Sequence, residues 1–188
     1  MNVLSTITRR KPLPLTVNDY RILHEAGAFV GRPRVELIEG VILTVNSQLR
    51  WHLAVKSGLS RRLGNKLEEM GLQYRAYCDG TVALSDDSAP DPDILIASDG
   101  PADEFVDGGV THLIVEVADT SLRFDLGRKR LLYARGAIPE YWVVSRRSMY
   151  RFWMPEDGDY RQRDKMAFGQ PMTSITIPCL TIESDGLI

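Results

Sequence analysis

Two acidic residues stand out because each lies within or beside an apolar run. Glu116 is the only charged residue of the run 113–117 (LIVEV), and Asp93 directly precedes the run 94–96 (ILI). Burying an unpaired carboxylate costs enough that the group normally takes up a proton, pairs with a cation or binds a metal. Glu116 therefore needs a partner, although a structural pair with an arginine would also satisfy it.

The strands that carry Asp93 and Glu116 would bring both carboxylates to one place if they were neighbours in a sheet. Two like charges about 4 Å apart cost roughly 4 kcal/mol at an effective dielectric near 20, so such a pair needs a cation between its members. Mg²⁺ takes carboxylate oxygens and keeps several waters. With open positions it binds a phosphate oxygen and lowers the pKa of an attacking water. We therefore predict a Mg²⁺ site at Asp93 and Glu116, with Mn²⁺ as a substitute ion.

A lysine follows on the next predicted helix. Asp125 and Lys129 are four residues apart, and Tyr133 lies one turn further along the same face. If this helix returns Lys129 to the end of the Glu116 strand, its ammonium would orient a nucleophilic water or offset charge that develops on a phosphate. The competing interpretation is an ordinary surface ion pair with Asp125, worth a few tenths of a kcal/mol.

Bulk properties place limits on the class of protein. The chain has 188 residues, a formal net charge of −2 and a pI of about 5.9. This balance weighs against a tight sequence-independent DNA binder, which usually carries a basic footprint. No apolar run has the length of a membrane span, and the first residues lack the apolar segment of a secretory signal. Cys78 and Cys179 lie far apart, which favours reduced thiols over a zinc site. These features predict a cytoplasmic protein with a loose arm at 1–14 and a single domain at 15–188.

The remaining patterns predict a mixed α/β fold. A hairpin turn at Glu39-Gly40 separates two short strands, and the amphipathic helix 48–70 follows. Its basic residues form a solvated face or a phosphate-contacting surface; they are Arg50, Lys56, Arg61, Arg62 and Lys66. The other expected helices cover 16–26, with Thr16 as N-cap, and 123–134; the expected strands cover 34–39, 41–45, 73–84, 93–97, 111–117, 140–144, 149–153 and parts of 155–160 and 175–182.

Taken together, these residues resemble the PD-(D/E)xK nuclease superfamily. The resemblance rests on Pro92-Asp93, on Glu116-Val117-Ala118 and on Lys129. The superfamily usually has its lysine two residues after the second acid, where this chain has Ala118, so the lysine has moved to the helix. This variant resembles the Uma-type restriction endonuclease branch, as do residues 35–40, His52 and residues 136–144. The resemblance spans roughly residues 15–153.

The resemblance implies a restriction-endonuclease-like mixed sheet core flanked by helices, with antiparallel hairpins at the ends. It implies that Asp93 and Glu116 hold the metal, that Lys129 is the catalytic lysine and that Glu36 is a further acid near the metal. Alternatively, Glu36 lies on the solvent face of its hairpin. His52 is expected to be a helix-surface or core residue rather than a ligand. Ser145 stands where this branch usually has an aspartate.

These expectations give one leading hypothesis and two alternatives. The leading hypothesis is a Mg²⁺-dependent endonuclease that hydrolyses phosphodiester bonds of DNA, and that acts as a homodimer to reach both strands. The first alternative is a non-catalytic nucleic-acid-binding or regulatory module that retains the fold, which the acidic pI and the displaced lysine would favour. The second is a structural protein that dimerises through the apolar hairpins near Trp153.

Overall fold

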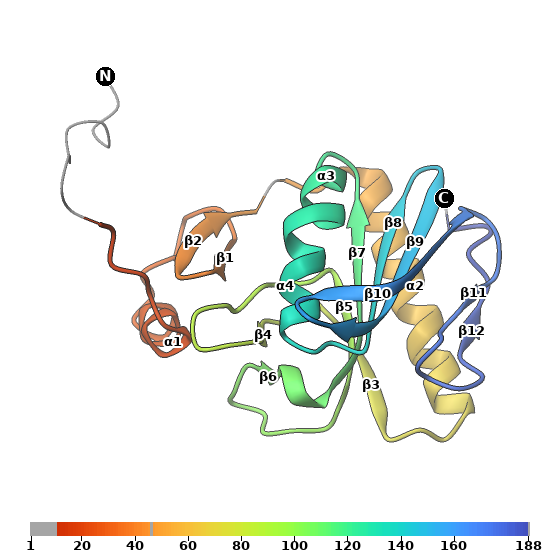
Figure 1. The fold of residues 1–188 in the computed structure, drawn as a ribbon, viewed down its shortest axis with the longest axis horizontal. Helices are drawn as coiled ribbons and strands as arrows, with labels where there is room; N and C mark the ends of the chain where they lie inside the picture. The colour runs from red at the N-terminus through yellow and green to blue at the C-terminus, as the bar shows by residue number, and fades with distance from the viewer. Residues whose placement is uncertain (1–10, 46, 188) are drawn as a thin grey trace.

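The computed structural model describes residues 11–45 and 47–187 (Figure 1). Residues 1–10 of the predicted arm therefore lie outside the described residues, and residues 11–16 form no helix or strand. Helix α1 (Val17–Glu25) begins after Thr16, as predicted. The backbone N–H of Asp19 donates to Thr16 Oγ1 at 3.1 Å, and the Thr16 N–H donates to Asp19 Oδ2 at 2.9 Å. This reciprocal capping box fixes the helix start.

A six-stranded mixed sheet forms the centre of the molecule, which confirms the predicted fold class. Strands β7 and β8 are parallel, and every other neighbouring pair in this sheet is antiparallel. The parallel pair needs a crossover, which the helical segment between β7 and β8 supplies. In spatial order the strands are β10 (Asp159–Ala167), β9 (Ser148–Glu156), β8 (Glu140–Ser145), β7 (Thr111–Ala118), β5 (Ile94–Ser98) and β3 (Tyr74–Cys78).

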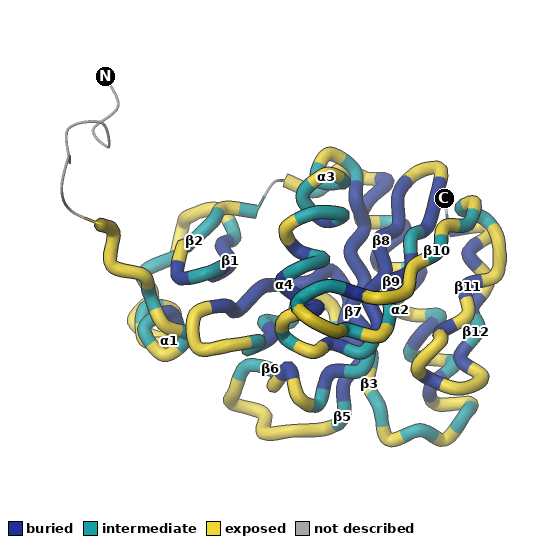
Figure 2. The backbone as a smooth tube through the Cα atoms, viewed as in Figure 1, coloured by how far each residue is buried: buried dark blue, intermediate teal, exposed yellow. Residues whose placement is uncertain are grey.

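Helices cover both faces of this sheet (Figure 1). The long helix α2 (Arg50–Glu69) packs with Val115 and Val117 of β7, together with the short hairpin of β11 (Met172–Thr173) and β12 (Thr181–Ile182). Ile114 and Ala118 of β7 point to the other face, where they pack with Tyr133 of α4 (Arg130–Arg135). The central strands are consequently buried along most of their length (Figure 2). Side chains alternate along a strand, so Glu116 belongs to the α4 face.

The crossover helix departs from prediction. We expected one continuous helix over 123–134, but the chain forms α3 (Leu122–Phe124), a π-helical turn η3 (Asp125–Lys129) and then α4. The N–H of Arg130 donates to the carbonyl of Asp125, five residues earlier. Such turns are rare and often occur at functional sites. We relate this one to the two charged side chains, Asp125 and Lys129, that it buries beside the sheet.

The N-terminal hairpin forms a sheet of its own, as predicted. Strands β1 (Val35–Ile38) and β2 (Val41–Thr44) are joined by Glu39 and Gly40, which have φ values of 50° and 74°. This left-handed pair suits a two-residue hairpin turn. The hairpin packs with α1 around Tyr20 and Leu37, and Leu37 pairs with Ala89 through two backbone hydrogen bonds. These contacts dock β1, which carries Glu36, against the main domain.

Two segments differ from the sequence-based expectation. Residues 98–109, to which no helix or strand was assigned, contain β6 (Val106–Asp107), which pairs in parallel with β4 (Val82–Ala83). The strand predicted over 175–182 is limited to β12, because the preceding residues turn around the carboxylate of Glu140. This fully buried carboxylate accepts hydrogen bonds from five groups: Trp142 Nε1, Ser174 Oγ, the N–H of Ile175, and the N–H and Oγ1 of Thr176.

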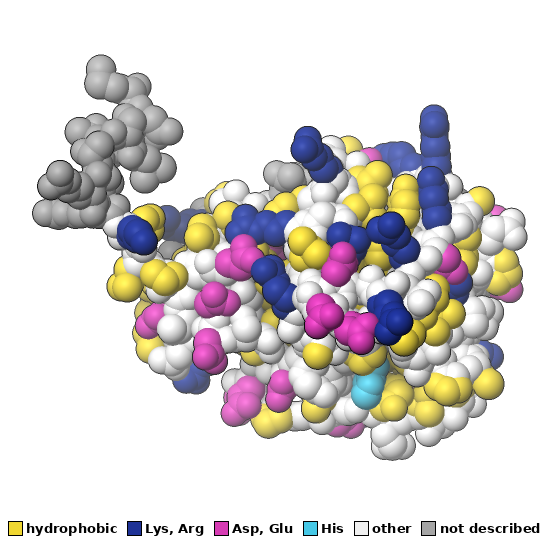
Figure 3. Space-filling model, viewed as in Figure 1, with side chains coloured by type: hydrophobic (Ala, Val, Ile, Leu, Met, Phe, Trp, Pro, Cys, Tyr) yellow, Lys and Arg dark blue, Asp and Glu magenta, His cyan; other side chains and the backbone are white. Residues whose placement is uncertain are grey.

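The outer surface carries charges of both signs (Figure 3). Lys and Arg side chains project above α3 and above the turn between β8 and β9, whereas Asp and Glu side chains gather around β6. Within the described residues, no helix is long and apolar enough to cross a membrane. Cys78 and Cys179 are both exposed and free.

Replacing Glu140 tests its role in anchoring the C-terminal segment. Glu140→Ala removes the acceptor for several donors, two of which belong to the buried Trp142 and Ser174. We expect the free energy of unfolding, measured by urea denaturation, to fall by about 3 kcal/mol or more. The matched control is Glu156→Ala, which breaks an exposed pair with Arg161 and should cost less than about 1 kcal/mol. Equal losses in the two variants would contradict this role.

Candidate active site

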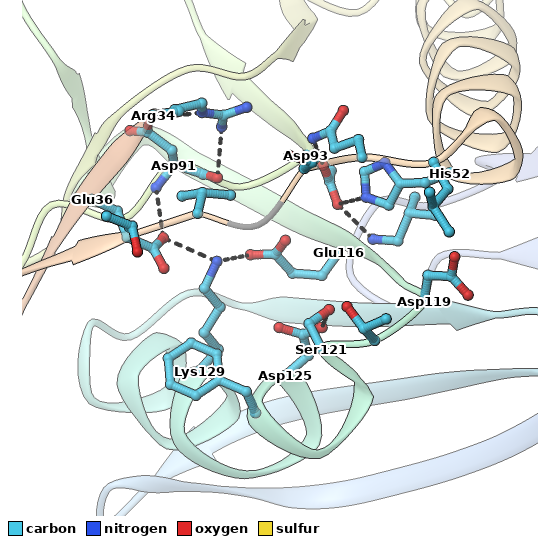
Figure 4. A pocket seen from close by; sticks show the side chains of 18 residues that line it. Arg34, Glu36, His52, Asp91, Asp93, Glu116, Asp119, Ser121, Asp125 and Lys129 are labelled. Atoms are coloured by element: carbon cyan, nitrogen blue, oxygen red, sulfur yellow. Dashed lines mark hydrogen bonds and ion pairs between the residues drawn. The ribbon is translucent and has the colours of Figure 1, made fainter. Parts of the chain in front are cut away.

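A pocket of about 140 Å³ lies where β5 begins and β7 ends (Figure 4). All four residues that the sequence singled out, Glu36, Asp93, Glu116 and Lys129, line it. Its other charged or ionisable lining residues are Arg34, His52, Asp91, Asp119 and Asp125. Five different segments of the chain supply these side chains, so only the fold brings them together: β1, α2, the β5 approach, the β7 end and the π-turn.

Strand register places Asp93 beside Glu116. Strands β5 and β7 are antiparallel neighbours in which Ile94 pairs with Val115, so Asp93 and Glu116 occupy the next position along the ladder. The N–H of Val117 donates to Asp93 Oδ2 at 2.8 Å, which holds the carboxylate against the end of β7. The neighbouring strands assumed in the sequence analysis are therefore present.

Lys129 lies between two glutamates. Its Nζ is 2.9 Å from Glu116 Oε1 and 3.0 Å from Glu36 Oε2, and all three side chains are at most 7% exposed (Figure 4). Tyr133, one turn later on the same helical segment, donates its hydroxyl to Glu116 Oε1 at 2.7 Å. The surface ion pair with Asp125 and the solvent-facing Glu36 were therefore wrong alternatives. Within the described residues Glu116 Oε2 has no hydrogen bond, so it is available to a ligand in the pocket.

Burial and mutual repulsion change the ionisation of these groups. Burial raises the pKa of Glu116 to about 8. The ammonium of Lys129 lowers this pKa, whereas the carboxylates of Asp93, Asp125 and Glu36 raise it further. The pKa of Asp125 rises to about 6, again mainly through burial. Burial opposes the charged form of Lys129, but the surrounding carboxylates outweigh it and raise its pKa. Burial and the neighbouring carboxylates therefore favour the protonated forms of Glu116 and Asp125 when no further cation is present.

Helix α2 contributes a second group of contacts that the sequence analysis did not assign to the site. His52 Nε2 lies 2.9 Å from Asp93 Oδ2, and Gln48 Nε2 donates to Asp93 Oδ1 at 3.2 Å. Lys56 is buried and binds Gln48 and Asp79, so its assignment to a solvated helix face was wrong. The available signal was the four-residue spacing of His52 and Lys56, which places both polar side chains on the buried side of an amphipathic helix. Gln48 lies two residues before the start of α2 at Arg50.

The approach to β5 adds another carboxylate. The N–H of Asp91 donates to Glu36 Oε2 at 3.3 Å, and Arg34 Nε lies 3.2 Å from Asp91 Oδ2. Thr81 Oγ1 donates to Asp91 Oδ1 at 2.6 Å. These bonds connect the hairpin residue Glu36 to the segment that leads into Asp93. The sequence feature that could have indicated Asp91 is the repeated Pro-Asp at 90–93.

The donor set fits a hard divalent cation. Within residues 11–45 and 47–187, no three His, Cys, Asp or Glu side chains are already arranged as a complete metal cluster. Mg²⁺, however, usually binds through one or two carboxylates and keeps waters in its other positions. Asp93 and Glu116 supply two adjacent carboxylates of this kind.

Comparison with known proteins agrees with this architecture. Residues 18–183 match the model of the Uma2 family, whose description reads "Putative restriction endonuclease". This chain belongs to the Uma2 family. Its fold is similar to the crystal structure of a putative nuclease belonging to DUF820 from Anabaena variabilis ATCC 29413, with a TM-score of 0.68 and 16% sequence identity. The similarity covers 93% of this chain and 97% of that one. No curated protein matches the sequence.

Three further residues of this Uma2 chain lie in strand β8: Tyr141, Trp142 and Ser145. Ser145, where the Uma-type branch usually has an aspartate, is buried at the end of β8, and its Oγ donates to the carbonyl of Ser148 at 2.8 Å. It closes the turn between β8 and β9. Tyr141 and Trp142 are fully buried in the core.

Removing the lysine tests the charge balance of the pocket. Lys129→Met leaves Glu36, Glu116 and Asp125 buried without their ammonium, and we expect the free energy of unfolding at pH 7 to fall by about 3–5 kcal/mol. Lys66→Met, which breaks an exposed pair with Glu69, is the control and should cost under about 1 kcal/mol. Adding Glu116→Gln to Lys129→Met should restore part of the loss. A Lys129→Met protein as stable as wild type would contradict the described pairing.

Proposed function

We propose that this Uma2 protein is a Mg²⁺-dependent endonuclease that hydrolyses phosphodiester bonds of DNA. The observation that carries the proposal is the position of the Lys129 ammonium, between Glu116 and Glu36 and in the same pocket as Asp93. Two adjacent carboxylates together with a buried ammonium match the needs of phosphoryl transfer, in which negative charge must be held and neutralised.

In this proposal Asp93 and Glu116 hold the metal, and Glu36 stands beside them. A bound Mg²⁺ would neutralise phosphate charge and lower the pKa of a coordinated water. Glu116 can contribute Oε2, because Tyr133 and Lys129 already occupy its Oε1. His52 and the N–H of Val117 orient the carboxylate of Asp93. Fixed outer contacts of this kind keep ligands in position before the metal arrives.

Lys129 acts as a donor of hydrogen bonds and of positive charge. Its ammonium has three N–H donors, and Glu116 and Glu36 engage two of them. The third is left for an attacking water or for a phosphate oxygen. The surrounding carboxylates raise the pKa of Lys129, which favours its protonated form. We therefore assign it to water orientation and charge stabilisation.

Loss of activity in three variants tests the catalytic assignment. Asp93→Ala, Glu116→Gln and Lys129→Ala should each reduce nicking of supercoiled DNA in Mg²⁺ or Mn²⁺ by at least about 100-fold, since each removes a charge that the transition state needs. Asp103→Ala, on an exposed loop, should cut at the wild-type rate. Circular dichroism of each variant verifies folding. Cleavage that persists in all three variants would refute the assignment.

Thermal stability tests the metal site without reference to cleavage. A cation that binds only the folded state at about 100 times its Kd adds roughly 2.7 kcal/mol, which corresponds to a rise in Tm of roughly 5–10 °C for a chain of this size. Mn²⁺ should produce this rise in wild type and in Asp103→Asn, but not in Asp93→Asn. An unchanged wild-type Tm would argue against the metal site. A rise in Tm without cleavage of DNA would favour the non-catalytic module instead.

The predicted homodimer is a separate part of the proposal. Two such sites facing opposite strands would let one assembly cut a duplex. Sedimentation velocity of the full chain, with and without a DNA duplex, measures the oligomeric state directly.

A further inference from the structure

Three exposed arginines lie in segments that border the acidic pocket of this chain. Arg50 is the first residue of α2 and directly follows the pocket-lining residues Gln48 and Leu49. Arg123 lies in α3, next to the pocket-lining Phe124. Arg147 lies in the turn between β8 and β9. All three side chains are exposed, and none makes an ion pair within residues 11–45 and 47–187.

Arg146 connects two of these positions. Its guanidinium forms a two-pronged pair with the pocket-lining Asp119, with Nε 3.0 Å from Oδ1 and Nη2 3.2 Å from Oδ2. The same guanidinium lies 4.7 Å from the centre of the Trp51 ring, the residue after Arg50. The turn that carries Arg147 is therefore fixed beside the start of α2 and the rim of the pocket. Arg50 and Arg147 belong to one side of the pocket mouth, and Arg123 extends the basic surface along α3.

The opposite end of the molecule has the reverse charge. Strands β5 and β9 both begin near the pocket and lead away from it. The loop after β5 carries exposed acids, and so does the turn after β9. These residues are Asp99, Asp103, Glu104, Asp107, Glu156 and Asp157. In Figure 3, Lys and Arg side chains project above α3 and the β8–β9 turn and acids lie around β6, with charges of both signs between them. Asp99 and Glu156 are paired with Arg75 and Arg161, so the excess of acid away from the pocket comes from Asp103, Glu104, Asp107 and Asp157.

We propose that Arg50, Arg123 and Arg147 form a basic rim that binds the phosphate backbone of a nucleic acid on both sides of the phosphodiester in the pocket. The inference rests on the proposed function, because it names how the same site acquires its substrate. An acidic pocket by itself repels a polyanion. Exposed arginines at its mouth attract the flanking phosphates and hold the backbone in register without reading its sequence. The oriented charge also steers the polyanion toward the pocket end of the protein.

Equilibrium binding tests the basic rim separately from catalysis. The probe is a fluorescein-labelled duplex of about 20 base pairs, as DNA and as RNA of the same sequence, with Ca²⁺ in place of Mg²⁺ to prevent cleavage. Fluorescence anisotropy of the full-length protein is recorded over a KCl series. Each lost phosphate contact should lower the salt slope by about 0.9 and weaken binding by roughly 8-fold near 0.1 M salt. Arg50→Gln, Arg123→Gln and Arg147→Gln should each show this change, and the triple variant a slope reduced by about 2.7.

Two arginines serve as matched controls. Arg61 on α2 and Arg163 on β10 are exposed and make no ion pair within the part of the chain that the structure describes, and they lie away from the pocket. Arg61→Gln and Arg163→Gln should bind within about 2-fold of wild type. Equal weakening by rim and control variants would overturn the proposal, since only total charge would then matter. Unchanged binding in the triple variant would overturn it as well. The Tm of each variant establishes that it is folded.

The outcomes separate the basic rim from the nuclease assignment. Binding that depends on the rim arginines, in a protein that does not cut DNA, would support the rim and refute the endonuclease. If the wild-type protein cuts DNA and the triple rim variant binds DNA as tightly as wild type, the endonuclease assignment is supported and the basic rim is refuted. Tighter binding of the DNA or the RNA duplex identifies which phosphate backbone the rim accepts.

Discussion

The burial of Lys129 between Glu116 and Glu36 is the interaction on which the organisation of this protein depends. Each of the three charges would be costly to bury alone, and each is tolerated because the other two are present. They come from the crossover helix, the central strand and the N-terminal hairpin, so the pairing requires all three elements to hold fixed positions. The π-turn, the register of β5 with β7 and the docking of the hairpin on Ala89 all serve this geometry.

Two buried glutamates of this fold have different surroundings: one stabilises the fold and the other lines the pocket. Glu140 is fully buried, and neutral donors from Trp142 and the C-terminal turn satisfy both of its oxygens. Its carboxylate stabilises a fold element and has no open position. Glu116 is paired instead with an ammonium among other carboxylates, and one of its oxygens stays available to the pocket. Unbalanced charge of this kind costs stability, and it is the feature expected of a site that awaits a cation and an anionic substrate.

Net charge is a weak guide to the partners of such a protein. The acidic pI weighed against tight nucleic-acid binding, but that argument treats charge as a sum. In the folded chain the exposed acids that follow β5 and β9 lie away from the pocket, and the three exposed arginines in segments that border it make no ion pair within the described residues. The strands fix this separation because they begin at the pocket and carry their following loops away from it. At about 0.1 M salt, charges more than about 10 Å away are largely screened. A polyanion therefore responds mainly to the charges on the part of the surface that it approaches.

The sequence by itself determined the fold class, the main elements and the identity of the buried acids. Apolar runs are local signals, so Glu116 inside its strand and Asp93 beside its own could be recognised without coordinates. The same local patterns could not decide which side chains meet. That Lys129 pairs with Glu36 rather than Asp125, and that His52 and Gln48 hold Asp93, follow from helices packing on a sheet between residues far apart in the chain. The π-turn also escaped prediction; the two charged side chains that it buries, Asp125 and Lys129, meet their surroundings only in the folded chain.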